Sequence, residues 1–258
     1  MLRSYRTEAL VLRRVNVGET DRILTLLSRD RGKISAIAKG SRRINSSLSG
    51  ATELGSYGSL QIAMGTNLDV VTQGELKNAF LGLRTSLDRI SRALYVLELT
   101  TEFLEDRQPH PDLFDLLLSA LYSLEKADYL DWVVSGFEAQ AMTILGYRPE
   151  VAICVSCGSR VSNPRQRDES AWARFSPALG GVLCVRCAAP HRDSMRVSAE
   201  VLAAIGRLEE FELPVLGREG APDAIQNEVR RVLRAHIRRH AEKEMKSTSF
   251  IERLRAEA

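Results

Sequence analysis

Four cysteines are the residues of this 258-residue chain whose spacing most directly indicates a chemical site. They form two C-x2-C pairs, Cys154 with Cys157 and Cys184 with Cys187, and 26 residues separate the two pairs. In each pair two thiolates project from one tight turn, and two such turns supply the four ligands of a tetrahedral zinc ion. Because four thiolates leave no coordination position open, the pattern predicts one structural Zn²⁺ per chain and no metal-centred catalysis.

The same cysteines have an alternative interpretation as free thiols or as a redox C-x-x-C pair of the thioredoxin type. A redox pair belongs beside a β-α-β unit, and no such pattern surrounds these cysteines. Zinc binding would supply folding free energy to a segment with few apolar residues. We expect Trp172, Phe175 and Leu183 to form the core of that segment.

Basic residues concentrate in the first 80 residues, which hold 12 Lys and Arg against 7 Asp and Glu, whereas the whole chain holds 36 against 33. Those near the ends of predicted strands can line one rim of a small domain: Arg13, Arg14, Lys33, Lys39, Arg42 and Arg43. Cationic side chains over a groove neutralise phosphates and release counterions, which gives sequence-independent binding that weakens with salt. Only Tyr5 and Tyr57 are available there for base stacking, so electrostatics would dominate. A solvated basic surface without a ligand is the alternative.

Motifs of common enzyme classes are missing from the sequence. It contains no G-x-x-x-x-G-K-[ST], no G-x-S-x-G and no H-E-x-x-H, so we predict no nucleotide cofactor and no enzymatic activity. His236 and His240 are four residues apart on a predicted helix, and packing or surface exposure explains them better than metal binding.

Period-two alternation and β-branched residues between Tyr5 and Glu75 predict strands. Their expected ranges are Glu8–Val17, Thr20–Ser28, Gly32–Lys39, Ser59–Gly65 and Leu68–Glu75. Five short strands in fewer than 80 residues favour a small barrel, and the OB-fold is the commonest such barrel that binds oligonucleotides. An SH3-like barrel would give a similar pattern.

Helical spacing follows from Leu76, where apolar residues recur at steps of three and four up to Leu104. Further helices are expected at Pro111–Lys126, at Asp128–Leu145 before a capping Gly146, at Ala199–Phe211 after the N-cap Ser198, and from Pro222 to the end. The chain is therefore predicted to be an α+β multidomain protein. Its segments would be an OB-fold nucleic-acid-binding domain (1–79), the first part of an all-α body (80–150), an inserted four-cysteine zinc module (151–195) and the second part of the helical body (196–258).

The longest run of apolar residues has five members, as in Ala93–Leu97, whereas a membrane span needs about 18. The N-terminus shows no apolar stretch followed by a small-residue cleavage site. We therefore expect a cytoplasmic protein without membrane contact, whose cysteines are not paired as disulfides.

Several motifs carry a resemblance to a known family. Gly18–Ser28, Gly32–Ile34 and Ala38–Arg43 are similar to its N-terminal E-x-D, glycine-turn and A-K-G-x-R-R motifs. Arg174–Cys184 is similar to its zinc loop, and Leu233–Leu254, with a Lys-Ser pair, to its closing helix. From about residue 5 to 254, the chain resembles the RecO family of bacterial recombination mediators and strand-annealing proteins.

The resemblance implies a DNA-binding protein that works without hydrolysing ATP. RecO-like proteins bind single- and double-stranded DNA, anneal strands coated by single-strand binding protein (SSB), and with RecR help load RecA during recombinational repair. The resemblance therefore implies DNA, RecR and SSB as partners, RecA as an indirect partner, and a nucleoid-associated location. Carried onto this sequence, it implies phosphate contacts at Lys39, Arg42 and Arg43, supported by Lys33, Arg13 and Arg14, with Arg196 as a weaker candidate. Many members of the family lack the cysteines, so zinc is not essential to the shared activity.

Other functions fit parts of the pattern. A DNA ligase can combine an OB-fold with a four-cysteine zinc site, but the K-x-D-G adenylation motif is absent from this sequence. A zinc-containing nucleic-acid-binding regulator without annealing activity would prefer RNA or one base sequence. An adaptor would use the basic barrel to bind an acidic partner such as the SSB tail. DNA could also bind the C-terminal helix, through Arg230, Arg231, Arg234, Arg238 and Arg239.

Overall fold

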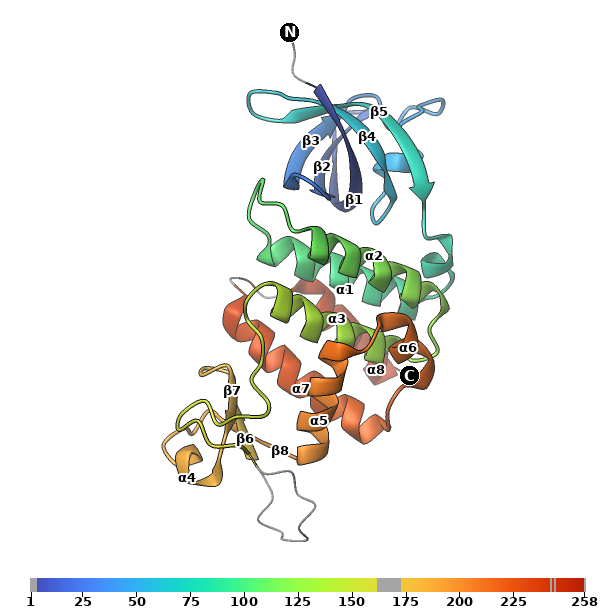
Figure 1. The fold of residues 1–258 in the computed structure, drawn as a ribbon. Helices are drawn as coiled ribbons and strands as arrows, with labels where there is room; N and C mark the ends of the chain where they lie inside the picture. The colour runs from blue at the N-terminus through green and yellow to red at the C-terminus, as the bar shows by residue number, and fades with distance from the viewer. Residues whose placement is uncertain (1–3, 162–172, 242, 244, 258) are drawn as a thin grey trace. The chain divides into compact units, whose positions relative to one another are not determined.

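The computed structural model describes residues 4–161, 173–241, 243 and 245–257. The chain divides into two compact units (Figure 1). The first unit consists of Met1–Lys126 and Met245–Ala258, and the second of Ala127–Glu244. The predicted segment boundaries at residues 79, 150 and 195 stay a prediction.

Five strands of the first unit close into a barrel: β1 (Ser4–Val17), β2 (Asp21–Ser28), β3 (Gly32–Ala38), β4 (Tyr57–Ala63) and β5 (Asp69–Asn78). The order around the barrel is β1-β2-β3-β5-β4. All neighbours are antiparallel except β3 and β5, which pair in parallel through Ala36 with Asp69 and Ile37 with Val70. A five-stranded barrel closed in this way is an OB-fold, which confirms the predicted fold of the N-terminal segment.

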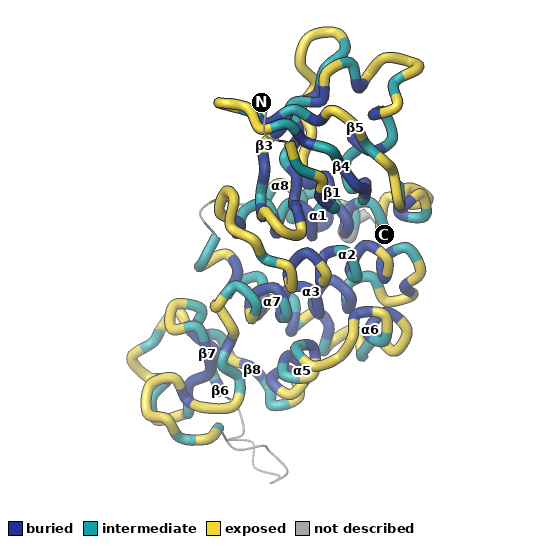
Figure 2. Tube along the Cα trace, turned by 45° about the horizontal axis from the view of Figure 1, so that its top comes forward, coloured by how far each residue is buried: buried dark blue, intermediate teal, exposed yellow. Residues whose placement is uncertain are grey.

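Buried residues recur along the strands of the barrel and form its interior, as the colouring by burial in Figure 2 shows. In β2 the side chains of Leu24 and Leu26 are completely buried, whereas those of the alternate residues Ile23 and Thr25 are only partly covered. This alternation places one side of each strand in a common core, whose residues are Ala9, Val11, Leu24, Leu26, Ile34, Ala36, Ala38, Leu48, Ala51, Leu60, Ile62 and Val71.

The helix predicted from Leu76 is wrong in its first part. Leu76 belongs to β5, where it pairs with Gly58 of β4, and Phe80 then adopts a left-handed conformation with φ of 46°. The first long helix begins only after Ser86, whose hydroxyl accepts a hydrogen bond from the Arg89 N–H group at 3.2 Å. Strand pairing satisfies the backbone groups around Leu76, so tertiary pairing overrides the helical spacing of the apolar residues.

The helices of the first unit are α1 (Leu87–Phe103), α2 (Pro111–Lys126) and α8 (Lys246–Glu257), with short 3-10 turns at Gly50–Thr52 and Leu81–Thr85. Helix α1 packs against both α2 and α8. The Glu98 carboxylate of α1 accepts hydrogen bonds from the backbone N–H groups of Lys246 and Ser247, both at 2.9 Å, and so caps α8. The prediction of a single helix from Pro222 to the end is wrong. The chain leaves helical geometry after His240, and a separate helix, α8, begins at Lys246.

The second unit is built around α3 (Leu130–Ile144), which packs against α5 (Ala199–Glu210), α6 (Leu213–Glu219) and α7 (Asp223–His240). The predicted caps are confirmed. Gly146 has φ of 84°, and the N–H groups of Gly146 and Tyr147 donate to the carbonyls of Thr143 and Met142, which is the Schellman pattern. The Ser198 hydroxyl accepts a hydrogen bond from the Val201 N–H group at 3.3 Å.

Among the described residues, every helix is too short or too polar to serve as a membrane span.

A small sheet carries the cysteine segment: β6 (Ala173–Ser176), β7 (Gly181–Leu183) and β8 (Met195–Val197), in the order β7-β6-β8, with the short helix α4 (Val185–Ala188). Phe175 and Leu183 are completely buried, as the sequence predicted, and Trp172 lies outside the described residues. The Phe175 ring meets the His236 ring of α7 edge to face, with centroids 5.8 Å apart.

Candidate metal centre and nucleic-acid interface

The four cysteines come together, as their spacing predicted. One sulfur atom from each of Cys154, Cys157, Cys184 and Cys187 lies within 4.8 Å of all the others, and the Cys157 and Cys184 sulfur atoms are 3.8 Å apart. A zinc–sulfur bond of about 2.3 Å in a tetrahedron requires sulfur atoms about 3.8 Å apart. The donor set and its spread therefore fit a four-thiolate zinc ion.

Each cysteine pair is held by a tight turn of the backbone. In the first turn the Cys154 N–H group donates to the Ser159 carbonyl at 2.8 Å, and the Gly158 N–H group donates back to the Cys154 carbonyl at 2.9 Å. In the second turn the Cys187 N–H group donates to the Cys184 carbonyl at 3.0 Å. Both turns aim two sulfur atoms at one point, and Cys154 packs there against Leu183.

Electrostatics also favour a cation at this point. A hydrogen bond from Ser159 lowers the pKa of the Cys157 thiol. At Cys187 a hydrogen bond from Ser156 lowers the thiol pKa, but the neighbouring sulfur atoms outweigh it and raise that pKa to about 11. A cation at this point relieves the repulsion between neighbouring thiolates, and a bound divalent metal keeps its thiol ligands deprotonated.

A basic turn, residues 39–43, follows β3 and carries the strongest predicted phosphate contacts. The Asp21 carboxylate accepts a hydrogen bond from the Gly40 N–H group at 2.8 Å, which lowers the pKa of Asp21. The Arg42 guanidinium donates to the Gly18 carbonyl at 3.1 Å. Gly40 has φ of 64°, which suits a glycine. These bonds fix the turn against the β1–β2 hairpin.

The side chains of the basic turn are presented to solvent. Lys39, Arg42 and Arg43 are all exposed, and in the part of the chain that the structure describes, none of them forms an ion pair with a carboxylate. The structure therefore brings together the three residues that the A-K-G-x-R-R motif supplies. Asp21 was identified in the sequence only as part of a motif, and its role as the acceptor for Gly40 depends on a contact 19 residues away.

The supporting candidates in the barrel lie in different surroundings. Arg13 is exposed, whereas Arg14 forms an ion pair with Glu53, which also binds Arg22 at 2.7 Å. Glu53 therefore partly neutralises the charge of Arg14. The contacts of Arg13 and Arg14 with DNA stay a prediction.

Lys33 does not share a rim with the basic turn. It lies at the opposite end of β3, about 20 Å along the strand from Lys39 at roughly 3.3 Å per residue. Its ammonium group donates to the Leu104 carbonyl and lies 3.4 Å from the Asp106 carboxylate. Lys39 lies in the turn that follows β3, so Lys33 and Lys39 are at opposite ends of this strand and cannot line one rim.

Arg196 lies in the second unit, on β8, next to two other arginines, Arg174 and Arg231. Its partner across the sheet is Arg174 of β6. The guanidinium of Arg231, on α7, donates to the Arg196 carbonyl at 3.0 Å. The alternative interface on α7 is thus partly engaged, because Arg230 also pairs with Asp131 at 3.2 Å. The pairing register of β6 and β8, which residue spacing does not reveal, places Arg174 beside Arg196.

Comparisons with known proteins cover nearly the whole chain. The family model described as Recombination protein O N terminal matches residues 1–80, and the model described as Recombination protein O C terminal matches residues 84–249. Three similar relatives carry the name DNA repair protein RecO. The relative from Roseiflexus sp. (strain RS-1) is 33% identical over 253 residues, or 98% of this chain and 87% of the relative. The relative from Desulforudis audaxviator (strain MP104C) is 35% identical over 98% of both chains. The relative from Heliobacterium modesticaldum (strain ATCC 51547 / Ice1) is 36% identical over 97% of this chain and 90% of the relative.

Proposed function

The chain belongs to the RecO family of DNA repair proteins, and on that premise we propose that it is a DNA-binding recombination mediator. It binds single- and double-stranded DNA and anneals complementary strands coated by SSB. With RecR, it helps load RecA onto SSB-coated single strands during recombinational repair. It does so in the cytoplasm, at the nucleoid, without a nucleotide cofactor and without catalysing covalent chemistry.

The basic turn carries this proposal. Its three cations are exposed and have no carboxylate partner among the described residues, and hydrogen bonds from Gly40 and Arg42 hold the backbone that presents them. Lys and Arg side chains held in this way neutralise phosphates and release their counterions. Base sequence has no part in such contacts, which suits a protein that must accept any pair of complementary strands.

Annealing follows from charge neutralisation. Two DNA strands repel each other through their phosphates, and cations that contact one or both backbones lower that repulsion. Base pairing then supplies the driving force. Of the supporting residues, Arg13 and Arg196 are exposed and contact phosphate directly. Lys33 and Arg14 already bind protein groups, and they contribute through the positive field around the barrel.

The four cysteines hold one structural zinc ion in this proposal. The ion supplies folding free energy to the cysteine segment and takes no part in strand pairing. The two turns that carry the cysteines orient the sulfur atoms, and Ser159 stabilises the Cys157 thiolate through its hydroxyl group.

An annealing assay tests the proposal. The rate at which two complementary SSB-coated oligonucleotides pair is measured with and without the protein, at low and high salt and with no nucleotide added. We expect acceleration that weakens with salt and that the double substitution Lys39→Glu with Arg42→Glu reduces. Arg207→Glu with Arg218→Glu is the matched control, because both residues are exposed on the second unit and the change in charge is the same.

The outcome separates the candidate functions. DNA binding without acceleration would contradict the annealing function and favour a zinc-containing regulator. Absence of both binding and acceleration would favour an adaptor for an acidic protein. Equal losses in the basic-turn variant and in the control would contradict the assignment of the basic turn.

A further inference from the structure

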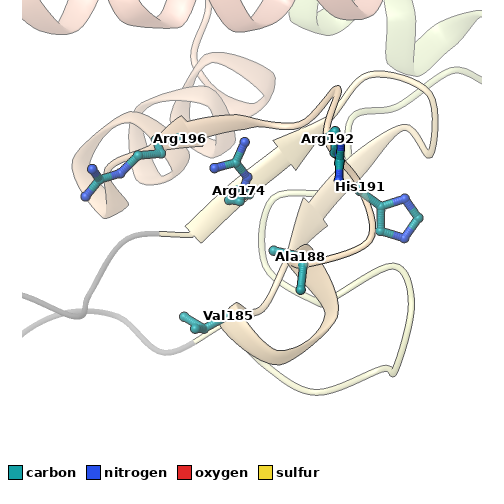
Figure 3. A pocket seen from close by; sticks show the side chains of 7 residues that line it. Arg174, Val185, Ala188, His191, Arg192 and Arg196 are labelled. Carbon is teal, nitrogen blue, oxygen red and sulfur yellow. The ribbon is translucent and has the colours of Figure 1, made fainter.

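The second unit contains a basic hollow beside the cysteine cluster, with a volume of about 540 Å³. Its walls come from β6, α4, β8 and the segment between α4 and β8, and consist of Arg174, Val185, Ala188, Ala189, His191, Arg192 and Arg196. Figure 3 shows Arg174 on the sheet between Arg196 and Arg192. No acidic side chain is among these lining residues.

Strand register puts two of these cations side by side. Arg174 and Arg196 are direct partners across the antiparallel pair β6–β8, so their side chains leave the sheet on the same face. Like charges in this relation destabilise a sheet. Arg192 is exposed next to them and adds a third guanidinium to the same hollow. A small sheet with such a pair is stabilised when an anion binds over it.

Arg174 is held in position for such a ligand. Its Nε–H group donates to the Ser194 hydroxyl at 2.7 Å, and its terminal nitrogen donates to the Ser194 carbonyl. The Ser194 hydroxyl in turn donates to the His191 carbonyl. A guanidinium has five N–H donors in a rigid fork, so these two bonds orient the group and leave further donors for a ligand.

We propose that the basic hollow binds a phosphodiester group of a DNA strand. Arg matches the tetrahedral oxygen atoms of phosphate with paired hydrogen bonds better than a point charge does. Arg192 and Arg196 are exposed, and Val185 at the edge is 67% exposed, so a continuous strand can pass over the hollow. An acidic peptide fits less well, because the apolar lining consists only of a valine and two alanines and offers no deep pocket for a large anchoring side chain.

The inference rests on the proposed DNA-binding function and adds a second phosphate site to it. The basic turn belongs to the first unit and the basic hollow to the second. A chain with one phosphate site in each unit can hold two backbones at once, which is the requirement for pairing two strands.

Salt dependence of DNA binding tests the basic hollow. The probe is a fluorescein-labelled oligothymidylate, followed by polarisation over a range of salt concentrations. The variant is Arg192→Glu with Arg196→Glu, and the control is again Arg207→Glu with Arg218→Glu. The logarithm of the binding constant falls with the logarithm of the salt concentration, and each lost phosphate contact reduces the magnitude of this slope by about 0.7 for single strands. We therefore expect the magnitude to be about 1.4 smaller in the variant and unchanged in the control. Arg192→Gln, which removes one exposed charge without reversing it, should reduce the magnitude of the slope by about 0.7.

The results discriminate between failure of the basic hollow and failure of the proposed function. If the wild-type protein binds the oligonucleotide and both hollow variants keep the slope of the control, the basic hollow is not a phosphate site, while the proposed function stands. If the wild-type protein does not bind the oligonucleotide, both proposals fail. If the variants lose binding to polyglutamate but keep their DNA slope, the hollow is a site for an acidic peptide and our proposal is overturned.

Discussion

Loss of one thiolate from the four-cysteine cluster should unfold the cysteine turns, including the short helix α4, and leave α3, α5, α6 and α7 of the second unit folded. Cys187→Ser preserves the size of the side chain but removes a zinc ligand. Without the metal, the buried core around the turns consists only of Cys154, Leu183 and Ala188 among the described residues. That core is too small to hold two irregular turns in place.

A comparison of free energies indicates that zinc binding determines whether the cysteine turns are folded. Burial of one leucine side chain contributes about 2 kcal/mol, and ordering the backbone costs roughly 1–2 kcal/mol for each residue of the turns. A structural zinc ion contributes about 10–16 kcal/mol. The β6–β8 sheet differs, because the completely buried side chains of Phe175, Val182 and Val197 anchor it and Phe175 also contacts His236 of α7.

Metal content and hydrogen exchange measure this effect. We expect one zinc per wild-type chain and much less in the variant. The amide protons of Cys154, Val155 and Val161, which donate to the carbonyls of Ser159, Val182 and Ala152, should lose protection, whereas the amides of α3 and α7 should keep it. Arg186→Ala is the control, because it alters the same turn as Cys187 without removing a ligand. Full protection of these amides in metal-free Cys187→Ser would refute the reasoning.

Lys39→Glu combined with Arg42→Glu should lower DNA affinity and reduce the magnitude of the salt slope by about 1.4 for single strands. The melting temperature should fall only slightly, because the hydrogen bond from Arg42 to the Gly18 carbonyl that is lost lies at the surface; unaltered affinity in a polarisation assay would contradict the interface. Glu98→Ala should cost about 1 kcal/mol, because it removes the cap of α8, and faster amide exchange confined to the start of α8 would confirm it. Burial lowers the pKa of His236, although a hydrogen bond with the Tyr147 carbonyl opposes the shift. The unfolded chain therefore binds this proton more readily than the folded chain, and stability should fall as the pH drops below about 6.5. Urea midpoints across that range should depend less on pH in His236→Gln, and an equal pH dependence in both proteins would exclude this cause.

The barrel was predictable from the sequence because apolar and polar residues alternate along much of its strands, and turns with glycine separate several of them. The predicted β2, Thr20–Ser28, differs from the observed Asp21–Ser28 by one residue. The cysteine cluster was predictable for a similar reason, since two local turns define it. In both cases the information lies within a few neighbouring residues.

Features that depend on long-range pairing were not predictable in this way. Apolar spacing around Leu76 suits a helix, yet β4 extends far enough to pair with that segment. The cap of α8 comes from Glu98, 148 residues before Lys246. The basic hollow depends on the register that sets Arg174 opposite Arg196, and spacing along the chain does not specify a register between distant strands.

The metal and the basic hollow should be coupled, and this coupling can be measured. Helix α4 contains Val185 and Ala188, which line the hollow, and it begins directly after the ligand Cys184 and includes the ligand Cys187. Loss of zinc should therefore disorder one wall of the hollow and lower the salt slope of DNA binding, while the basic turn of the first unit keeps its contribution.

A variant that combines metal-free Cys187→Ser with Arg192→Glu and Arg196→Glu should therefore have nearly the same salt slope of DNA binding as the variant with either change alone. The reason is that both changes act on the same site. Changes in slope that simply add would show that the hollow keeps its shape without the metal. In that case zinc would stabilise only the turns that bind it, and the phosphate site would depend on the β6–β8 sheet, which Phe175 and Val197 anchor without any metal.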